Sequence, residues 1–362
     1  MLPISLQRLY NQKLIGTSGL SPAQLVSLLG GIQAQNDSMA MWSIGARLPG
    51  LTENDIQSVI KERRIVRTWA MRGTLHYLAA SDILSTLKLL APGIIATNAR
   101  RYKQLELDEH TLLQCEDILQ DVLSGNNQLT REEIARVLSK RGISAEGQRA
   151  PYILQRAALD GLICFGGRDQ NQPTYTLLSD WLGGNAAPAK LTELSDFAAA
   201  YFLSHAPATL QDFSWWSGIL SVKVKNILPE LSRQVDRFTV GGKTYYGHRM
   251  DSDEPDPAVI LLPPYDEYLL GYKDREASLS NEYAKRVNAG GGMPKPAVIL
   301  NGRVIGTWKR EAKNNRLVIT VEAFEAVGDE VISHMEIAGQ RYGDFIGSVT
   351  ELRLVVNECH NR

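Results

Sequence analysis

Apolar and polar residues follow a helical spacing over the first two-thirds of the chain, in short blocks that open with helix-start signals. Ser21 is followed by proline and, three positions on, by Gln24, which is the order of a capping box. Thr130 precedes Arg-Glu-Glu in the same way, and Thr209 precedes Leu-Gln-Asp. These signals predict short helices that begin directly after each capping residue.

The blocks repeat an order of helix, short helix, helix and β-hairpin, which is typical of winged-helix domains. In residues 105–187 a helix over 145–159 precedes predicted strands over 162–165 and 174–178. The helices expected in residues 188–250 lie near 193–204, 210–217 and 222–232, before a hairpin over 237–248. Residues 1–104 are less regular, with predicted helices near 4–13, 22–30, 38–47 and 53–62 and a strand-rich stretch over 65–78. The pattern predicts a helix-rich α+β fold with three tandem winged-helix modules.

The remaining residues, 251–362, follow a different pattern. An acidic, proline-rich break over 251–257 and three glycines at 290–292 predict loops. Strands over 297–300 and 304–308 flank Asn301-Gly302, a type I′ turn signal. A further strand over 317–321 and a helix over 330–341 complete the prediction. We therefore expect a linker followed by a C-terminal β-hairpin and helix cap.

Composition indicates a folded protein that works inside the cell. The 362 residues are 44% hydrophobic and carry a net charge of -1, but residues 1–100 hold ten Lys plus Arg against five Asp plus Glu. A DNA-facing surface is therefore allowed in the N-terminal third. No apolar run reaches the roughly 20 residues of a membrane span, and the start has no signal-peptide core, so we expect a cytoplasmic protein. Cys115, Cys164 and Cys359 are too few and too widely spaced for a disulfide framework or metal site, and no cofactor is expected.

Common catalytic motifs are missing from the sequence, including HExxH, GxxxxGK[ST] and GxSxG. The six histidines are scattered without ligand spacing, so we interpret them as structural or exposed. One unusual segment remains, where Gly30-Gly31 breaks a helix and Gln33 and Gln35 follow two positions apart. In extended backbone these two amides would share one face. Taken alone, polar residues after paired glycines more often solvate a loop.

Three motifs in order resemble the AlkZ-type winged-helix DNA glycosylases, and the resemblance covers nearly the whole chain. They are Gln33-Ala34-Gln35, RTWAMRGTLH over residues 67–76 and LPPYDEYLLGYKDR over residues 262–275. The resemblance implies tandem winged helices that form a cradle around DNA, and removal of N7-alkylated purines, in some members as interstrand crosslinks. It also implies that Gln33 and Gln35 are the catalytic pair; a sister group has Asp in the second position.

Two glutamines can serve a glycosylase whose leaving base is already cationic. Hydrolysis of the N-glycosidic bond usually needs a general acid, and an amide cannot donate a catalytic proton. A guanine alkylated at N7 leaves as a neutral base, so the enzyme has to hold water and stabilise the sugar cation. Our hypothesis is that Gln35 holds the attacking water and that Gln33 orients it or faces the sugar. Asp37 either assists the water or caps the next helix.

Other charged and aromatic residues have competing interpretations. Asp266 and Glu267 are rival carboxylates, for which we favour salt bridging or loop anchoring. Trp215 and Trp216 adjoin on one helix, and core packing is favoured over stacking on a base. The candidate DNA-binding residues are Arg67 and Arg72, and, at the C-terminal hairpin, Asn301, Gly302, Arg303, Lys309 and Arg310. For Arg67 and Arg72 a solvated strand face is equally compatible with the sequence.

Two functions from other classes stay open at this point, a noncatalytic winged-helix transcription regulator and a protein-interaction scaffold, because fold alone does not choose. A regulator usually dimerises on a palindromic site, whereas this chain has three modules and no heptad seam. We therefore expect a monomer that binds double-stranded DNA containing alkylated purines.

Overall fold

The computed structural model describes residues 2–16, 18–170, 172–183, 193–248, 250, 256–288, 290, 293–313 and 316–356, and it shows a helix-rich mixture of helices and sheets. The helices are α1 (Ile4–Asn11), α2 (Pro22–Leu29), α3 (Asp37–Gly45), α4 (Glu53–Lys61), the 3₁₀ turn η1 (Met71–Gly73), α5 (Ile83–Gln104), α6 (Glu109–Leu123), α7 (Arg131–Lys140), α8 (Arg149–Leu159), α9 (Leu178–Leu182), α10 (Leu194–Ser204), α11 (Leu210–Ser217), α12 (Ser221–Asn226), α13 (Leu228–Leu231), α14 (Glu267–Leu270), α15 (Ala284–Val287) and α16 (Asp329–Ile346). Within these ranges, no helix is both long and apolar enough to cross a membrane.

The strands form four separate sheets. They are β1 (Ile32–Gln33), β2 (Ile65–Trp69), β3 (Leu75–Ala79), β4 (Leu129–Thr130), β5 (Ile163–Asp169), β6 (Gln172–Leu177), β7 (Arg237–Val240), β8 (Lys243–Tyr246), β9 (Val259–Leu262), β10 (Ala297–Leu300), β11 (Arg303–Lys313), β12 (Arg316–Ala323) and β13 (Thr350–Val356). The sheet orders are β1-β3-β2, β4-β6-β5, β7-β8 and β13-β12-β11-β10-β9.

The predicted helix starts are confirmed. Ser21, Thr130 and Thr209 each accept a hydrogen bond from the backbone three residues on and complete a capping box, so α2, α7 and α11 begin where expected. The 22-residue helix α5 is not among the predicted elements. Pro92 lies inside it and, followed by Gly93, looks in the sequence like a break. Packing of α5 against α8 and η1 outweighs that local preference.

The C-terminal part is larger than the predicted hairpin and helix cap. Asn301 and Gly302 both have positive φ, 47° and 83°, which confirms the type I′ turn between β10 and β11. The sequence analysis missed β9 and β13, which lie at the two edges of a five-stranded sheet. β12 and β13 are parallel, and α16 connects them. Most of the predicted acidic break and two of the three glycines at 290–292 lie outside the described residues.

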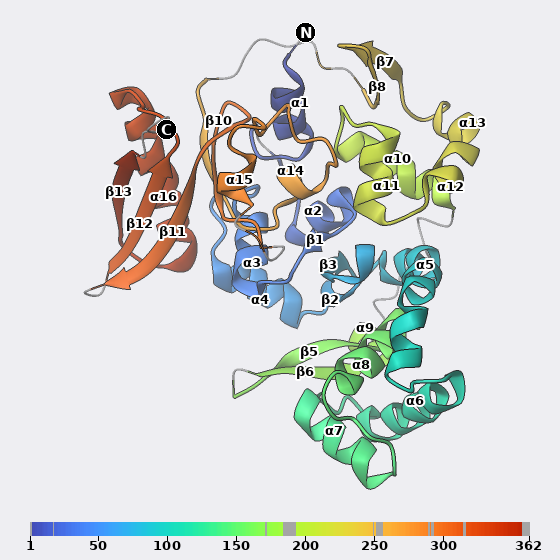
Figure 1. Ribbon diagram of the computed structural model, residues 1–362. Coiled ribbons are helices and arrows are strands. Elements are labelled where there is room, and N and C mark those ends of the chain that lie inside the picture. The colour runs from blue at the N-terminus through green and yellow to red at the C-terminus, as the bar shows by residue number, and fades with distance from the viewer. Residues whose placement is uncertain are drawn as a thin grey trace.

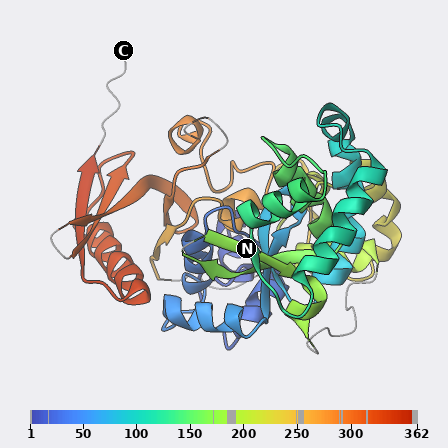
Figure 2. The same cartoon turned by 90° about the horizontal axis from the view of Figure 1, so that it is seen from below.

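The described residues form three hydrophobic cores, and two of these cores combine distant parts of the chain. The first joins residues 2–79 to residues 260–345, the second joins residues 66–90 to residues 164–272, and the third lies within residues 102–177. Figures 1 and 2 show the result, with the β9–β13 sheet at one end, residues 105–183 at the other and the N-terminal residues between them. The predicted segments therefore share cores, and the domain boundaries stay a prediction.

A buried ion pair fastens α3 to the segment before α14. The Arg47 Nη1 and Asp266 Oδ2 atoms lie 2.8 Å apart, and both side chains are almost fully buried. Ser43 also donates to Asp266, at 2.7 Å. These contacts confirm the salt-bridging interpretation of Asp266. Trp216 is buried and Trp215 is 44% exposed, which confirms that one ring of the pair packs in the core.

Candidate active site

Paired glycines turn the chain from α2 into β1 and so place the first candidate glutamine. Gly30 ends α2 in the left-handed conformation, with φ 72°, and Gly31 follows with φ 134°. A Cβ at Gly31 would lie 2.8 Å from the Met71 Cε atom, so only glycine fits without a shift. The next two residues form β1, in which Gln33 lies opposite His76 of β3.

The two candidate glutamines lie in different environments. Gln33 is 8% exposed, whereas Gln35 is exposed beyond the end of β1. The chain bends at Gln35 and Asn36 before α3 begins. The expectation that one extended strand carries both amides is therefore wrong. Gln33 is held by the protein, and Gln35 faces solvent beside it.

Arg72 fixes the orientation of the Gln33 side chain. Its Nη2 atom donates to Gln33 Oε1 at 3.2 Å, and its Nη1 atom donates to the carbonyl oxygen of Trp216. A guanidinium has only donors, so the Gln33 amide must point its carbonyl toward Arg72. The NH₂ group of Gln33 is then what the side chain can offer to a water or a substrate. Burial lowers the pKa of Arg72 below its usual value, and the charge of Glu267 acts in the opposite direction.

A buried polar cluster lies behind Arg72. Trp216 Nε1 donates to Glu267 Oε2 at 2.8 Å, and the His205 Nε2 atom lies 3.7 Å from the same oxygen. Burial raises the pKa of Glu267, but His205 and the charge of Arg72 outweigh burial. The pKa of Glu267 therefore lies below its usual value. Burial, with the charge of Arg72, lowers the pKa of His76 to about 4. At neutral pH Glu267 is therefore ionised and His76 is neutral.

Asp37 is the third candidate of the glutamine segment, and it is part of an ionic network. It does not cap α3, because Asn36 is the capping residue and Asp37 is the first residue of the helix. Arg168 of β5 donates to Asp37 Oδ2 at 2.6 Å, and Tyr77 donates to Oδ1. Burial raises the pKa of Asp37, but Tyr77, Arg67 and Arg168 together lower it below its usual value.

Arg67, predicted as a DNA contact, holds the glutamine segment from behind. Its Nη2 and Nε atoms donate to the carbonyl oxygen of Ala34 at 2.8 and 3.2 Å. Its guanidinium lies 4.8 Å from the ring centre of Phe165, and the side chain is only 14% exposed. Arg67 thus links the residue between the two glutamines to the β5–β6 hairpin.

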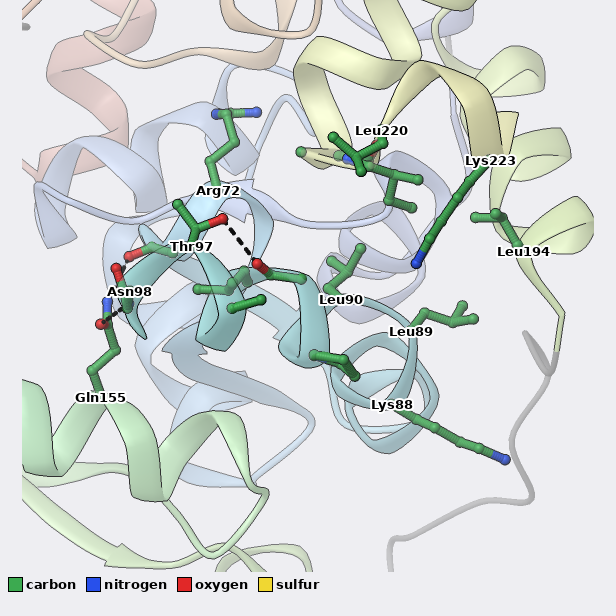
Figure 3. A pocket seen from close by; sticks show the side chains of 18 of the residues that line it. Arg72, Lys88, Leu89, Leu90, Thr97, Asn98, Gln155, Leu194, Leu220 and Lys223 are labelled. Carbon is green, nitrogen blue, oxygen red and sulfur yellow. Dashed lines mark hydrogen bonds between the residues drawn. The ribbon is translucent and has the colours of Figure 1, made fainter. Parts of the chain in front are cut away.

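A groove of about 1060 Å³ begins at Arg72 and runs between α5, α8 and the loop from α11 to α12 (Figure 3). Several residues of α5 line it, among them Leu89, Leu90 and Thr97, and Lys223 extends into it from α12 (Figure 3). Lys88, Asn98 and Gln155 also line the groove, and the Asn98 and Gln155 side chains are hydrogen-bonded at 2.9 Å. Apart from Arg72, the groove residues named here are not among the predicted site residues, because they come from helices far apart in the chain.

The C-terminal residues predicted to bind DNA lie in mixed settings. Gly302 is buried against Ser5 of α1, and its carbonyl oxygen accepts from the Tyr268 hydroxyl at 2.7 Å, a setting that does not favour the predicted DNA contact. Arg310 is partly buried, where it donates to the Tyr342 hydroxyl and to Ser38. Three predicted residues keep exposed side chains, namely Asn301, Arg303 and Lys309. Lys309 lies 3.6 Å from Glu322.

Within the described part of the chain, no group of three or more His, Cys, Asp or Glu residues is arranged to hold a metal ion. Cys115 and Cys164 are buried, and Cys359 lies outside the described residues. Burial raises the pKa of Cys115 to about 11, so its thiol is protonated at neutral pH.

Comparisons with known proteins agree with this architecture. The family model described as DNA glycosylase AlkZ-like matches residues 26–345. The interstrand DNA cross-link repair glycosylase of Streptomyces sahachiroi is 29% identical over 326 residues, which are 83% of this chain and 84% of that protein. The solved structure of the Streptomyces sahachiroi DNA glycosylase AlkZ superposes with a TM-score of 0.83 over 97% of this chain and 98% of that chain, at 23% identity. The chain belongs to the AlkZ-like DNA glycosylase family and is a DNA-repair enzyme that acts on N-glycosyl bonds.

Proposed function

We propose that this glycosylase removes N7-alkylated, cationic purines from double-stranded DNA, including those in interstrand crosslinks, with Gln33 and Gln35 as the catalytic residues. One observation carries the proposal: the titratable groups around Gln33 are in states that cannot protonate a leaving base. Asp37 and Glu267 have lowered pKa values and are ionised at neutral pH, and His76 is neutral. A base that departs without help must carry its own positive charge.

The reaction then needs little from the protein. Water adds to C1′ as the bond from C1′ to N9 breaks, the bond electrons neutralise the cationic base, and the water proton passes to solvent. Positive charge develops on the deoxyribose, where oriented dipoles lower the barrier. Gln35, exposed beside the site, holds the attacking water through its carbonyl oxygen. Gln33 orients that water with the NH₂ group that Arg72 leaves available.

DNA contacts follow from the groove and from the repeated helix and hairpin order. We propose that the three modules are winged helices forming a cradle, and that a DNA strand leaving the site follows the groove past Lys88 and Lys223. Arg303, exposed at the β10–β11 turn, adds a positive charge at a distance from the groove. A relative described as a cross-link repair glycosylase supports crosslinks as substrates. A cytoplasmic monomer remains part of this proposal.

Single-turnover base release tests the two glutamines. We expect Gln35→Ala and Gln33→Ala each to slow release of 7-methylguanine from a duplex by about 10²- to 10³-fold, as when one preorganised polar group is removed. DNA affinity, measured by fluorescence anisotropy, should stay within about two-fold, because DNA binding rests on other residues. Gln24→Ala, on the exposed start of α2, is the control and should release base at the wild-type rate. Undiminished release by the Gln33 and Gln35 variants would remove both residues from the mechanism.

A further inference from the structure

Arg72 carries a half-buried charge, and in the described part of the chain no carboxylate is in direct contact with it. The hydrogen bonds described for its guanidinium all go to neutral oxygens, those of Gln33 Oε1 and the carbonyl groups of Trp215 and Trp216. Neutral acceptors alone compensate a desolvated guanidinium poorly. A balancing negative charge must therefore lie nearby for Arg72 to stay against Gln33.

Glu267 is the carboxylate that acts on Arg72. It is 1% exposed on α14. Burial lowers the pKa of Arg72, and the negative charge of Glu267 opposes that lowering. Of its two oxygens, Oε2 accepts from Trp216 Nε1 at 2.8 Å, whereas Oε1 is buried and has no hydrogen-bond partner among the described residues. An incompletely satisfied buried carboxylate costs stability, so its presence needs a reason other than packing.

Trp216 connects the two charges. Its backbone carbonyl accepts from Arg72 while its indole N–H donates to Glu267, and its ring is buried beside Phe197 and Tyr201. The ring also fits tightly against α2, since a Cβ at Gly30 would lie 2.9 Å from the indole. Trp216 therefore links Glu267 to Arg72, whose guanidinium also donates to Gln33.

The backbone at Arg72 gives an independent observation. Arg72 has φ 57° and ψ 15°, the left-handed region that a non-glycine residue adopts at a cost of about 1 kcal/mol or more. The next residue, Gly73, also has a positive φ, which glycine adopts without strain. A glycine at position 72 would make the same turn without the strain that Arg72 carries. The strained conformation is what places the guanidinium between Gln33 and Trp216.

We infer that Glu267 is a positioning residue for the glycosylase reaction: through Trp216 and Arg72 it fixes the Gln33 amide in the orientation that the attacking water requires. Without the negative charge of Glu267, the Arg72 guanidinium lowers its free energy by moving toward the solvent in the groove, where water hydrates its charge. The Gln33 side chain then loses its only described hydrogen bond, the one from Arg72, and its amide can rotate. The inference rests on the proposed role of Gln33, and it assigns no contact between Glu267 and the substrate.

The test is a double-mutant cycle in single-turnover release of 7-methylguanine. Glu267→Gln keeps an acceptor for Trp216 and removes the charge. We expect at least a ten-fold lower rate with DNA affinity within two-fold. In an Arg72→Leu background, Glu267→Gln should lower the release rate by less than a further two-fold, because its effect passes through Arg72. Asp82→Asn, which neutralises a buried carboxylate bonded to Ser27 instead, is the control and should keep the wild-type rate per folded molecule.

The outcomes separate this inference from the proposed function. A wild-type rate for Glu267→Gln, or an equal loss in both backgrounds, overturns the inference. If Glu267→Gln does not fold, Trp216→Phe decides, since it removes the indole donor to Glu267 and keeps an aromatic ring at this position. Slowed release with unchanged affinity supports the inference, and an unchanged rate overturns it. Gln33→Ala is measured alongside. Its full activity contradicts the proposed function, whereas an inactive Gln33→Ala with a fully active Glu267→Gln contradicts the inference alone.

Discussion

At the scale of single residues, the site depends on charges held in unusual states. His76 is fully buried, and burial together with the Arg72 charge lowers its pKa to about 4, from 6.5 in an unfolded chain. Between pH 4 and pH 6.5, His76 therefore binds a proton in the unfolded chain but not in the folded protein. The free energy of unfolding should therefore fall as pH drops from 6.5 toward 4, by about 3 kcal/mol in total from His76.

Urea unfolding at half-unit steps from pH 7.5 to 4 measures this effect. His205 is also buried with a lowered pKa and adds to the slope. We expect His76→Gln to make the slope shallower without abolishing it, whereas His110→Gln, at an exposed position of α6, should leave it unchanged. An equal slope in the His76→Gln protein would show that folding does not lower the pKa of His76.

At the scale of elements, the turn between α2 and β1 decides where Gln33 lies. Gly31→Ala should destabilise the protein by about 1–3 kcal/mol, because alanine is strained at φ 134° and its Cβ would press on Met71 and Leu78. Chemical denaturation measures the loss, and base release should slow as β1 shifts. Gly19→Ala is the control, since a Cβ there meets nothing within 4 Å. Equal stability of the two variants would contradict this account of the turn.

Local signals in the sequence predicted elements better than they predicted the site. The capping boxes at Ser21, Thr130 and Thr209 needed only neighbouring residues, so their helices start as expected. The pairing of Gln33 with His76 depends on the register between two strands 43 positions apart, which no local pattern specifies. The positive charge of Arg72 makes it a candidate DNA contact in the sequence. Its contact with Gln33, however, depends on a left-handed backbone conformation that the sequence does not reveal.

At the scale of the whole molecule, long-range packing limits what a linear pattern can predict. The first core unites the N-terminal residues with the C-terminal sheet, so consecutive modules in the sequence do not correspond to separate cores. The same interlocking brings Glu267 of the PPYDEY motif to Trp216 and, through Trp216 and Arg72, connects it to Gln33, although Gln33 and Glu267 lie 234 positions apart. Gln33, Arg72 and Glu267, one residue from each of the three motifs, are thus connected through Trp216.

The central claim is that two amides suffice because the lesion itself supplies the positive charge that drives base departure. The most direct measurement compares two bases in one duplex sequence under single-turnover conditions, 7-methylguanine, which is cationic, and uracil, which is neutral. We predict release of 7-methylguanine and no release of uracil above the rate without enzyme. Uracil excised at a rate comparable to that of 7-methylguanine would contradict the account, because it would require a proton donor that the residues around Gln33 do not provide.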